Sequence, residues 1–224
     1  MRLFTAWKTF VAMAGCATAA LCLSAQTPTT PGTPAPVKAE GVPPRATPAD
    51  YQAHGEAGPV TVGAEFTGHS VATPESTLTT EDFVVIETGV YGPPGTPIKL
   101  SREDFQLRIN GKKVLLPSQP FGLVVKTLKD PELEPTASET KSKTSVGTGG
   151  QGGASDPPPP YRVPDDLRHA WGQRLQKISL PEGSRTLPQA GLIYFTYRGK
   201  TEKLQSVELI YTGPTGTATL ALQP

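Results

Sequence analysis

Cysteine is nearly absent from this chain: 2 of its 224 residues are cysteines, and both, Cys16 and Cys22, lie close to the start. The chain after residue 25 therefore holds no thiol. We expect it to form no disulfide, to bind no metal through thiolates and to use no cysteine nucleophile. A secreted domain without disulfides has to be stabilised by its own hydrophobic core, which favours a domain larger than the small cross-linked scaffolds.

An excess of charge of one sign is also lacking, since 21 basic residues stand against 20 acidic ones. Proteins that bind nucleic acids usually cluster lysine and arginine and have a high isoelectric point, so we expect no nucleic-acid partner. Histidine is rare too: the chain contains His54, His69 and His169, and no two of them stand at the spacing of metal ligands. We therefore expect neither a metal nor another cofactor.

Recognisable catalytic motifs are missing as well. The chain has no nucleophile-elbow pattern, and the glycine-rich residues 147–153 lack the lysine that completes a phosphate-binding loop. The carboxylates Glu81–Asp82 and Glu103–Asp104 are adjacent in sequence, so their side chains point apart, whereas glycoside hydrolysis needs two carboxylates that converge. These absences favour a non-catalytic protein. The alternative is a secreted hydrolase whose acidic residues come together from distant parts of the chain.

Proline and glycine, in contrast, are abundant, with 25 and 23 residues, and much of both falls in two segments, 26–50 and 136–164. Segments so poor in large apolar residues cannot bury enough surface to offset the entropy lost on ordering. We expect a proline-rich disordered spacer over residues 26–57, which is either a stalk or an inert tail. We also expect a disordered loop over residues 136–160.

The first residues have the pattern of an export signal. Arg2 and Lys8 form a positively charged start, an apolar run extends to Leu23, and small residues follow up to Ala25. The apolar run is shorter than the ~20 residues that a membrane-spanning helix needs. The pattern predicts a signal peptide over residues 1–25 and a periplasmic or extracellular destination.

Two other fates of this leader stay open. Met13-Ala14-Gly15-Cys16 resembles the lipobox of bacterial lipoproteins, in which the cysteine is lipidated and becomes the new N-terminus, so Cys16 is a candidate lipidation site. The leader could also stay uncleaved as an N-terminal anchor. We expect contact with a membrane only through the leader, and only if it is lipidated or retained.

Alternating apolar residues predict several β-strands in the rest of the chain. Residues 60–66 alternate, whereas residues 83–86 are apolar on both faces, as in a central strand. Asn110-Gly111 is a strong hairpin signal, because both residue types tolerate positive φ, and it predicts a partner strand over residues 112–116. Further strands are predicted over residues 192–197, 207–211 and 218–222.

The predicted strands lie on both sides of the glycine-rich segment, and the three after it are too few for a stable core of their own. We therefore predict a mainly β fold: one immunoglobulin-like antiparallel β-sandwich over residues 58–224, formed by both parts of the chain and interrupted by the disordered loop. Two separate small domains are the alternative.

One or two short helices complete the predicted fold. Apolar residues from Phe121 to Leu128 recur at helical spacing behind a candidate cap, Ser118. A second helix is predicted to begin at Pro164, and its apolar stripe includes Trp171.

The second helix also carries the candidate binding surface. Arg168 and Arg174 flank Trp171, and Tyr161 precedes the helix, so these four residues could form an aromatic and basic patch. Because Trp171 also belongs to the apolar stripe, we favour a core anchor for its ring, and the surface patch is the alternative.

Residues 105–112 (Phe-Gln-Leu-Arg-Ile-Asn-Gly-Lys) and the later blocks 187–195 and 207–211 follow a recurrent strand pattern. With these blocks the chain resembles uncharacterised exported proteins of soil bacteria and, more loosely, the telokin-like, immunoglobulin-fold accessory domains of bacterial lipoproteins. The resemblance implies a binding or accessory module of the cell envelope or the extracellular space, whose partner is an unidentified protein or glycan of the envelope. Its motifs are structural, so it transfers no catalytic residue.

Overall fold

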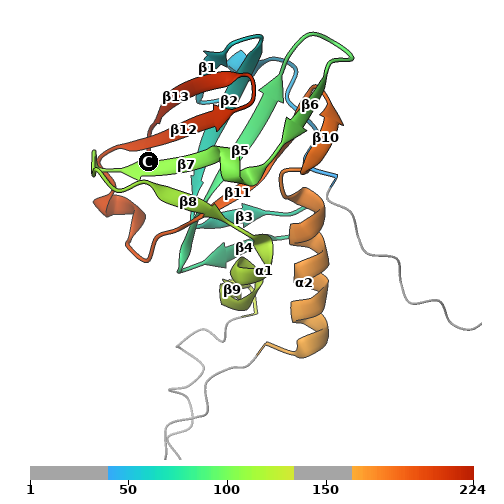
Figure 1. Ribbon diagram of the computed structural model, residues 1–224. Helices are drawn as coiled ribbons and strands as arrows, with labels where there is room; N and C mark the ends of the chain where they lie inside the picture. The colour runs from blue at the N-terminus through green and yellow to red at the C-terminus, as the bar shows by residue number, and fades with distance from the viewer. Residues whose placement is uncertain (1–39, 134–162) are drawn as a thin grey trace, which may run out of the picture. The chain divides into compact units, whose positions relative to one another are not determined.

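The structure is a computed structural model that describes residues 40–133 and 163–224 (Figure 1). The predicted signal peptide, the candidate lipidation site Cys16, the first part of the predicted spacer, the predicted loop 136–160 and Tyr161 lie outside the described residues.

The described residues are mainly β structure, as predicted, and most of their strands belong to one antiparallel sheet of eight strands. Across the sheet the strands follow in the order β1 (Ala53–Ala57), β2 (Val60–Gly68), β5 (Phe83–Tyr91), β11 (Gln189–Thr196), β8 (Leu116–Gln119), β7 (Phe105–Ile109), β12 (Val207–Gly213) and β13 (Gly216–Leu222).

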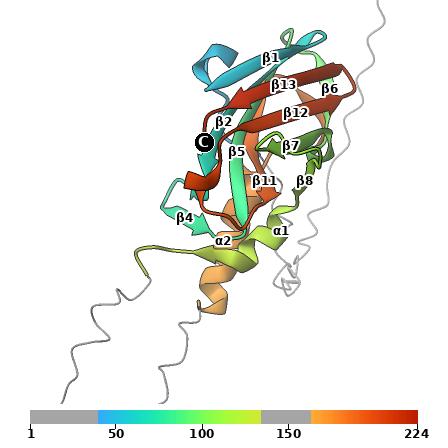
Figure 2. The ribbon, with the colours of Figure 1, turned by 90° about the vertical axis from the view of Figure 1, so that its left-hand side faces the viewer.

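The immunoglobulin-like sandwich is not confirmed, because this sheet curls into a nearly closed barrel (Figures 1 and 2). A sandwich needs two separate sheets, but β8 pairs with β11 through Tyr194 and Gln119 and with β7 through Leu107 and Leu116. The short strand β8 therefore joins what would be two sheets into one. The two edge strands of the sheet, β1 and β13, approach each other where the barrel nearly closes. A β-carbon on Gly55 would lie 3.5 Å from the β-carbon of Ala218 there.

Smaller elements complete the fold. Two further sheets consist of β6 (Pro97–Leu100) with β10 (Gly183–Thr186), and of β3 (Ser70–Ala72), β4 (Thr77–Thr80) and β9 (Leu128–Lys129). The helices are α1 (Phe121–Val124) and α2 (Asp165–Ile178), with 3₁₀ turns η1 (Pro48–Asp50), η2 (Arg102–Asp104), η3 (Val125–Thr127) and η5 (Thr201–Lys203).

Two hydrophobic clusters lie on opposite faces of the central strands. Val84 and Ile86 of β5 point into the barrel interior, where Phe195 joins them. Val85 points the other way, into a second cluster that includes Trp171 of α2. The prediction that residues 83–86 are apolar on both faces because the strand is central is therefore confirmed, since all four side chains are buried.

The predicted spacer extends too far along the chain. Residues 40–52, which we call the N-terminal strap, lie on the sheet: the N–H of Val42 donates to the carbonyl of Ala190 at 2.9 Å, and Tyr51 is 4% exposed. Residues 53–57 then form β1. Proline-rich composition predicted disorder here. Burial of the Tyr51 ring on the sheet offsets the conformational entropy that the strap loses on ordering.

That site is made by two glycines facing each other on neighbouring strands, Gly63 of β2 and Gly89 of β5. A β-carbon on Gly63 would lie 2.6 Å from ring carbon Cδ2 of Tyr51, and one on Gly89 would lie 2.6 Å from its hydroxyl oxygen. The absence of both side chains therefore leaves the space that the Tyr51 ring occupies. Tyr91 contacts the same ring edge-on, with the ring centres 6.1 Å apart.

The helix predicted over residues 121–128 is shorter than expected and has a different start. Helix α1 ends at Val124 and continues as the turn η3. Ser118 does not cap it: this residue lies in β8, and its hydroxyl donates to the carbonyl of Arg102 at 2.6 Å.

The turn predicted at Asn110-Gly111 is present, but its partner strand begins later than residues 112–116. Asn110 and Gly111 have φ values of 52° and 63°, both in the left-handed region. Strand β8 starts at Leu116, opposite Leu107, so residues 110–115 form a longer loop. The Asn110 side chain holds this loop against the segment before β12, because its Oδ1 accepts from the N–H of Gln205 at 2.7 Å and its Nδ2 donates to the carbonyl of Lys203 at 3.2 Å.

We expect Asn110→Ala to lower the free energy of unfolding by about 2 kcal/mol, because alanine disfavours the left-handed conformation and makes none of the side-chain hydrogen bonds. Asn110→Gly keeps the backbone freedom and should cost about 1 kcal/mol. Urea unfolding followed by circular dichroism measures both variants. A parent-like midpoint for Asn110→Ala would contradict the role of this side chain.

Candidate functional site

Helix α2 begins where the sequence predicts it. Pro164 stands before its first residue, and its carbonyl accepts from the N–H of Arg168 at 3.0 Å. Asp165 and Asp166 lie in the first turn, where negative charge favours the helix dipole. The predicted apolar stripe is buried at Trp171, as well as at Leu175 and Ile178.

The four residues of the predicted binding patch are not brought together. Trp171 is 1% exposed and packs in the second cluster, so its ring is a core anchor and not part of a surface. Arg174 pairs with Glu75 at 2.8 Å, beside the turn between β3 and β4. Arg168 pairs with Asp165 at 3.0 Å, and Tyr161 lies outside the described residues.

Arg168 does border an open groove between α1–η3 and α2, with a volume of about 480 Å³. Its apolar floor consists of Phe121 and Val125, with Gly122 and Gly172 beside them. A β-carbon on Gly172 would lie 3.7 Å from a methyl of Val125, so the two helical segments pass close to each other at this point. The rim is polar and consists of Lys126, Asp165, Arg168, His169, Gln173 and Gln176.

Sequence reasoning missed this groove because it assigned Phe121 and Val125 to the core-facing side of a helix. Val124 and Leu128 are buried as that pattern predicts, but Phe121 and Val125 remain half-exposed beside α2. No local signal shows that α1 and α2 would lie side by side. The groove is a property of how the two helices pack.

The three histidines lie in different environments. His54 is exposed on β1, and His169 on the groove rim lies 3.1 Å from the side chain of Gln173. Both ring nitrogens of His69 contact backbone carbonyls, at 2.7 Å for Phe83 and 2.8 Å for Gly199. Across residues 40–133 and 163–224, no three histidine, cysteine or acidic side chains are grouped so that they could hold a metal ion.

Two carboxylates converge on the outer face of the sheet, where Glu65 of β2 stands directly opposite Glu87 of β5. Arg45 from the strap neutralises both. Its guanidinium bonds to Glu87 with Nε and Nη2, each at 3.1 Å, and its Nη1 pairs with Glu65. Partial burial on its own lowers the pKa of Arg45. The bonds to the two carboxylates outweigh this effect and hold the pKa above its ordinary value.

The same arginine lies over the Tyr51 ring, 4.4 Å from its centre. Burial, together with Tyr91, raises the pKa of the Tyr51 phenol, so this phenol stays neutral over the physiological range. We call Arg45, Tyr51, Glu65 and Glu87 the strap clamp. With both carboxylates bound to one guanidinium, the clamp is suited to holding the strap in place.

The adjacent carboxylates singled out from the sequence lie apart from this clamp. Glu81 pairs with Lys129 at 2.8 Å, and Asp82 pairs with Arg198 at 3.0 Å. Glu103 and Asp104 lie in η2, where burial raises the pKa of Asp104. Glu81 and Asp82 therefore form ion pairs, and Glu103 and Asp104 lie in a turn. None of the four lines the groove.

Within the described ranges, no helix is both long and apolar enough to cross a membrane.

No protein-family model and no curated protein matches the chain. A solved structure described as a "putative lipoprotein (ycdA)" from Bacillus subtilis subsp. subtilis strain 168 is similar, with a TM-score of 0.34 and 11% identity. The similarity covers 76% of this chain, which spans 38% of the length of that one.

Proposed function

We propose that this protein is an exported, non-catalytic binding module of the cell envelope. In this proposal the groove between α1–η3 and α2 holds a short apolar segment of a partner protein, with negative charge beside it. The groove is the observation that carries the proposal, because its floor is apolar and its volume of about 480 Å³ lies in the usual range of ligand sites.

The charge of the rim favours an acidic partner. Lys126 is exposed and forms no ion pair with another described residue, and Arg168 stands across the groove with Asp165 as its exposed partner. The positive charges of Lys126 and Arg168 would attract carboxylates that flank an apolar segment of the partner. A protein segment suits the site better than a glycan, because among the described residues the groove offers a sugar ring only Phe121 and the rim residue His169 as aromatic faces.

Two supports lie outside the groove. The non-catalytic part rests on the engagement of the acid–base side chains: both nitrogens of His69 contact carbonyls, and Glu65 and Glu87 share Arg45. The export part rests on residues 1–25, whose pattern is that of a signal peptide. Mass spectrometry of the chain recovered from host envelopes tests this part: a start at Gln26 supports cleavage, whereas lipidated Cys16 would make the protein a membrane-tethered lipoprotein.

The groove can be tested with two defined peptides, leucine-phenylalanine-leucine flanked by aspartates and the same core flanked by lysines. We expect the aspartate peptide to shift the methyl signals of Val125 in NMR spectra in a saturable way, and the lysine peptide to bind at least about tenfold more weakly. Lys126→Glu should reverse this preference. Equal binding of both peptides, or no shift at Val125, would overturn the proposal.

Gly122→Leu and Leu123→Ala form a matched pair of variants for the same titration. A β-carbon at Gly122 would meet no atom within 4 Å, so a larger side chain can start from this position and occupy space beside the groove. Leu123 is 42% exposed on the same helix but does not line the groove. We expect the first variant to weaken binding and the second to leave it unchanged. A hydrolytic activity of the protein that one of its side chains controls would exclude the non-catalytic part of the proposal.

A further inference from the structure

Unpaired positive charge gathers at the end of the barrel where the loop between β7 and β8 meets the segment before β12. Lys112 and Lys113 lie in that loop, and Lys200 and Lys203 lie in the segment that contains η5. All four are exposed, and no ion pair links any of them to another described residue. We call these lysines, together with Val114, the lysine tip.

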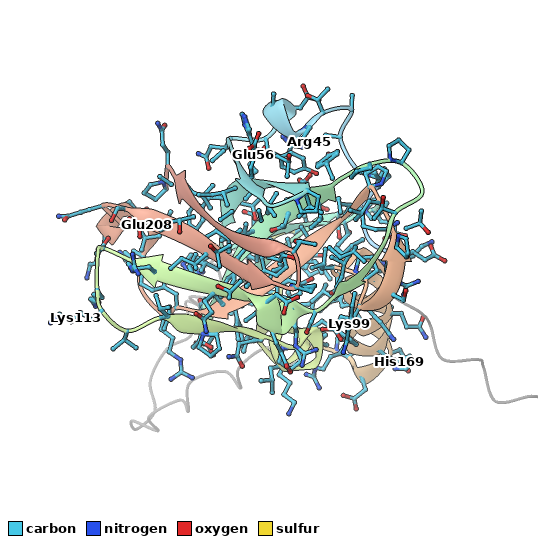
Figure 3. The ribbon with its side chains drawn as sticks, turned by 45° about the horizontal axis from the view of Figure 1, so that its top comes forward. Arg45, Glu56, Lys99, Lys113, His169 and Glu208 are labelled. Carbon is cyan, nitrogen blue, oxygen red and sulfur yellow. The ribbon has the colours of Figure 1, made fainter. Side chains whose placement is uncertain are left out.

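The two parts of the tip are held side by side by Asn110. Its side chain donates to the carbonyl of Lys203 at 3.2 Å and accepts from the N–H groups of Gln205 at 2.7 Å and Ser206 at 3.2 Å. The lysines are therefore presented by a fixed turn and not by two independent loops. Figure 3 shows Lys113 projecting from the edge of the molecule.

The tip also exposes an apolar side chain. Val114 is 73% exposed, compared with 42% and 44% for Leu123 and Leu133, the other large hydrophobic side chains that are exposed in the described residues. One apolar side chain beside several lysines matches the boundary between headgroups and acyl chains of an anionic membrane. A nucleic acid or another soluble polyanion would use the lysines but gain little from Val114.

The charge at this end is not balanced locally. Four lysines of the tip stand against Glu202 in the same segment, while the whole chain carries a net charge of only +1. The nearby pairs Arg108–Glu208 and Arg198–Asp82 are internally compensated. The net positive charge of the tip is therefore a local feature that an overall near-neutral composition conceals.

We propose that the lysine tip docks this protein on an anionic phospholipid surface, with Val114 entering the interfacial region and the four lysines facing lipid phosphates. This proposal departs from the expectation that a membrane is contacted only through the leader. Lys113 and His169 lie at opposite sides of the view in Figure 3, so a tip docked on a membrane leaves the groove rim accessible. The proposal does not depend on what the groove binds.

The test uses the chain as exported and processed by a host, with its N-terminus established by mass spectrometry. Co-sedimentation compares vesicles of phosphatidylcholine containing about one third phosphatidylglycerol with vesicles of phosphatidylcholine alone. We expect binding to the anionic vesicles at low salt, little binding to the neutral ones, and loss of binding at about 0.5 M salt, where exposed charges are screened.

Lys112→Gln combined with Lys113→Gln should weaken the partition onto anionic vesicles about 25-fold, because each lysine near such a surface contributes about fivefold. Lys99→Gln combined with Lys177→Gln removes the same charge from β6 and from the end of α2, and should leave the partition unchanged. Val114→Ser should weaken it about fivefold. These substitutions are on exposed side chains, so folding is expected to be preserved.

Three results would overturn the proposal. The first is an equal loss in the two double variants, and the second is no binding to anionic vesicles at low salt. The third is tight binding of soluble polyphosphate together with a parent-like vesicle partition for Val114→Ser, which would assign the tip to a soluble polyanion.

Discussion

Trp171→Ala is expected to lower the free energy of unfolding by about 4 kcal/mol, within the range of about 3–5 kcal/mol for deletion of a buried tryptophan. The indole is 1% exposed and lies in the cluster that joins α2 to the outer side of the central strands. Val85 of β5 and Tyr194 of β11 belong to the same cluster. Removal of the ring leaves a cavity at the joint between helix and sheet.

Urea unfolding monitored by far-ultraviolet circular dichroism measures this loss. Arg168→Ala is a control on the same helix, because Arg168 is exposed and its pair with Asp165 is a surface pair, so its effect should stay below about 0.5 kcal/mol. If both variants were as stable as the parent, Trp171 would not be a core anchor, and the aromatic and basic patch predicted from the sequence would return as the better interpretation.

Gly191→Ala should cost about 3 kcal/mol, the upper part of the range for overpacking a tight site. A β-carbon at Gly191 of β11 would lie 2.3 Å from the Cα of Leu180 and 2.4 Å from its backbone nitrogen. The obstacles are backbone atoms, which no change of rotamer can move aside. The segment after α2 would have to leave β11 and break the hydrogen bond from the N–H of Leu180 to the carbonyl of Leu192.

Gly122→Ala is the matched control for this substitution. No atom lies within 4 Å of a β-carbon at Gly122, and alanine favours the helical conformation over glycine by up to about 1 kcal/mol. We expect this variant to be as stable as the parent or slightly more stable. Thermal unfolding of both variants provides the comparison, and a Gly191→Ala protein that unfolds at the parent temperature would show that the close approach of Leu180 to β11 does not matter.

Local periodicity predicted the elements of the fold better than their assembly. The double-sided apolar start of β5 and the buried stripe of α2 follow from residue spacing alone, and both predictions are confirmed. The barrel-like closure depends on β8, which has four residues and pairs with both β7 and β11. Pairing between strands distant in the sequence has no local signal, so an immunoglobulin-like sandwich and a curled single sheet could not be told apart.

The strap shows a second limit of composition. Residues 40–52 are rich in proline and were assigned to a spacer, yet Arg45 and Tyr51 have partners on β2 and β5. These partners are two glycines and two glutamates, none of which suggests a binding surface when read in order along the chain. The candidate site was limited in the same way, since residue spacing identified the buried stripe of α2 with Trp171, but gave no sign that α1 and η3 would lie beside the helix and form a groove with it.

The strap also determines how the barrel is attached to the part of the chain that precedes it. A pulling force on residue 40 first loads the bonds of Gly41 and Val42 with the carbonyls of Lys177 and Ala190. It then reaches the Arg45–Glu87 pair, and only after that strand β1. These contacts lie in series along the strap, so a force applied at residue 40 has to break them before strand β1 can separate from the sheet.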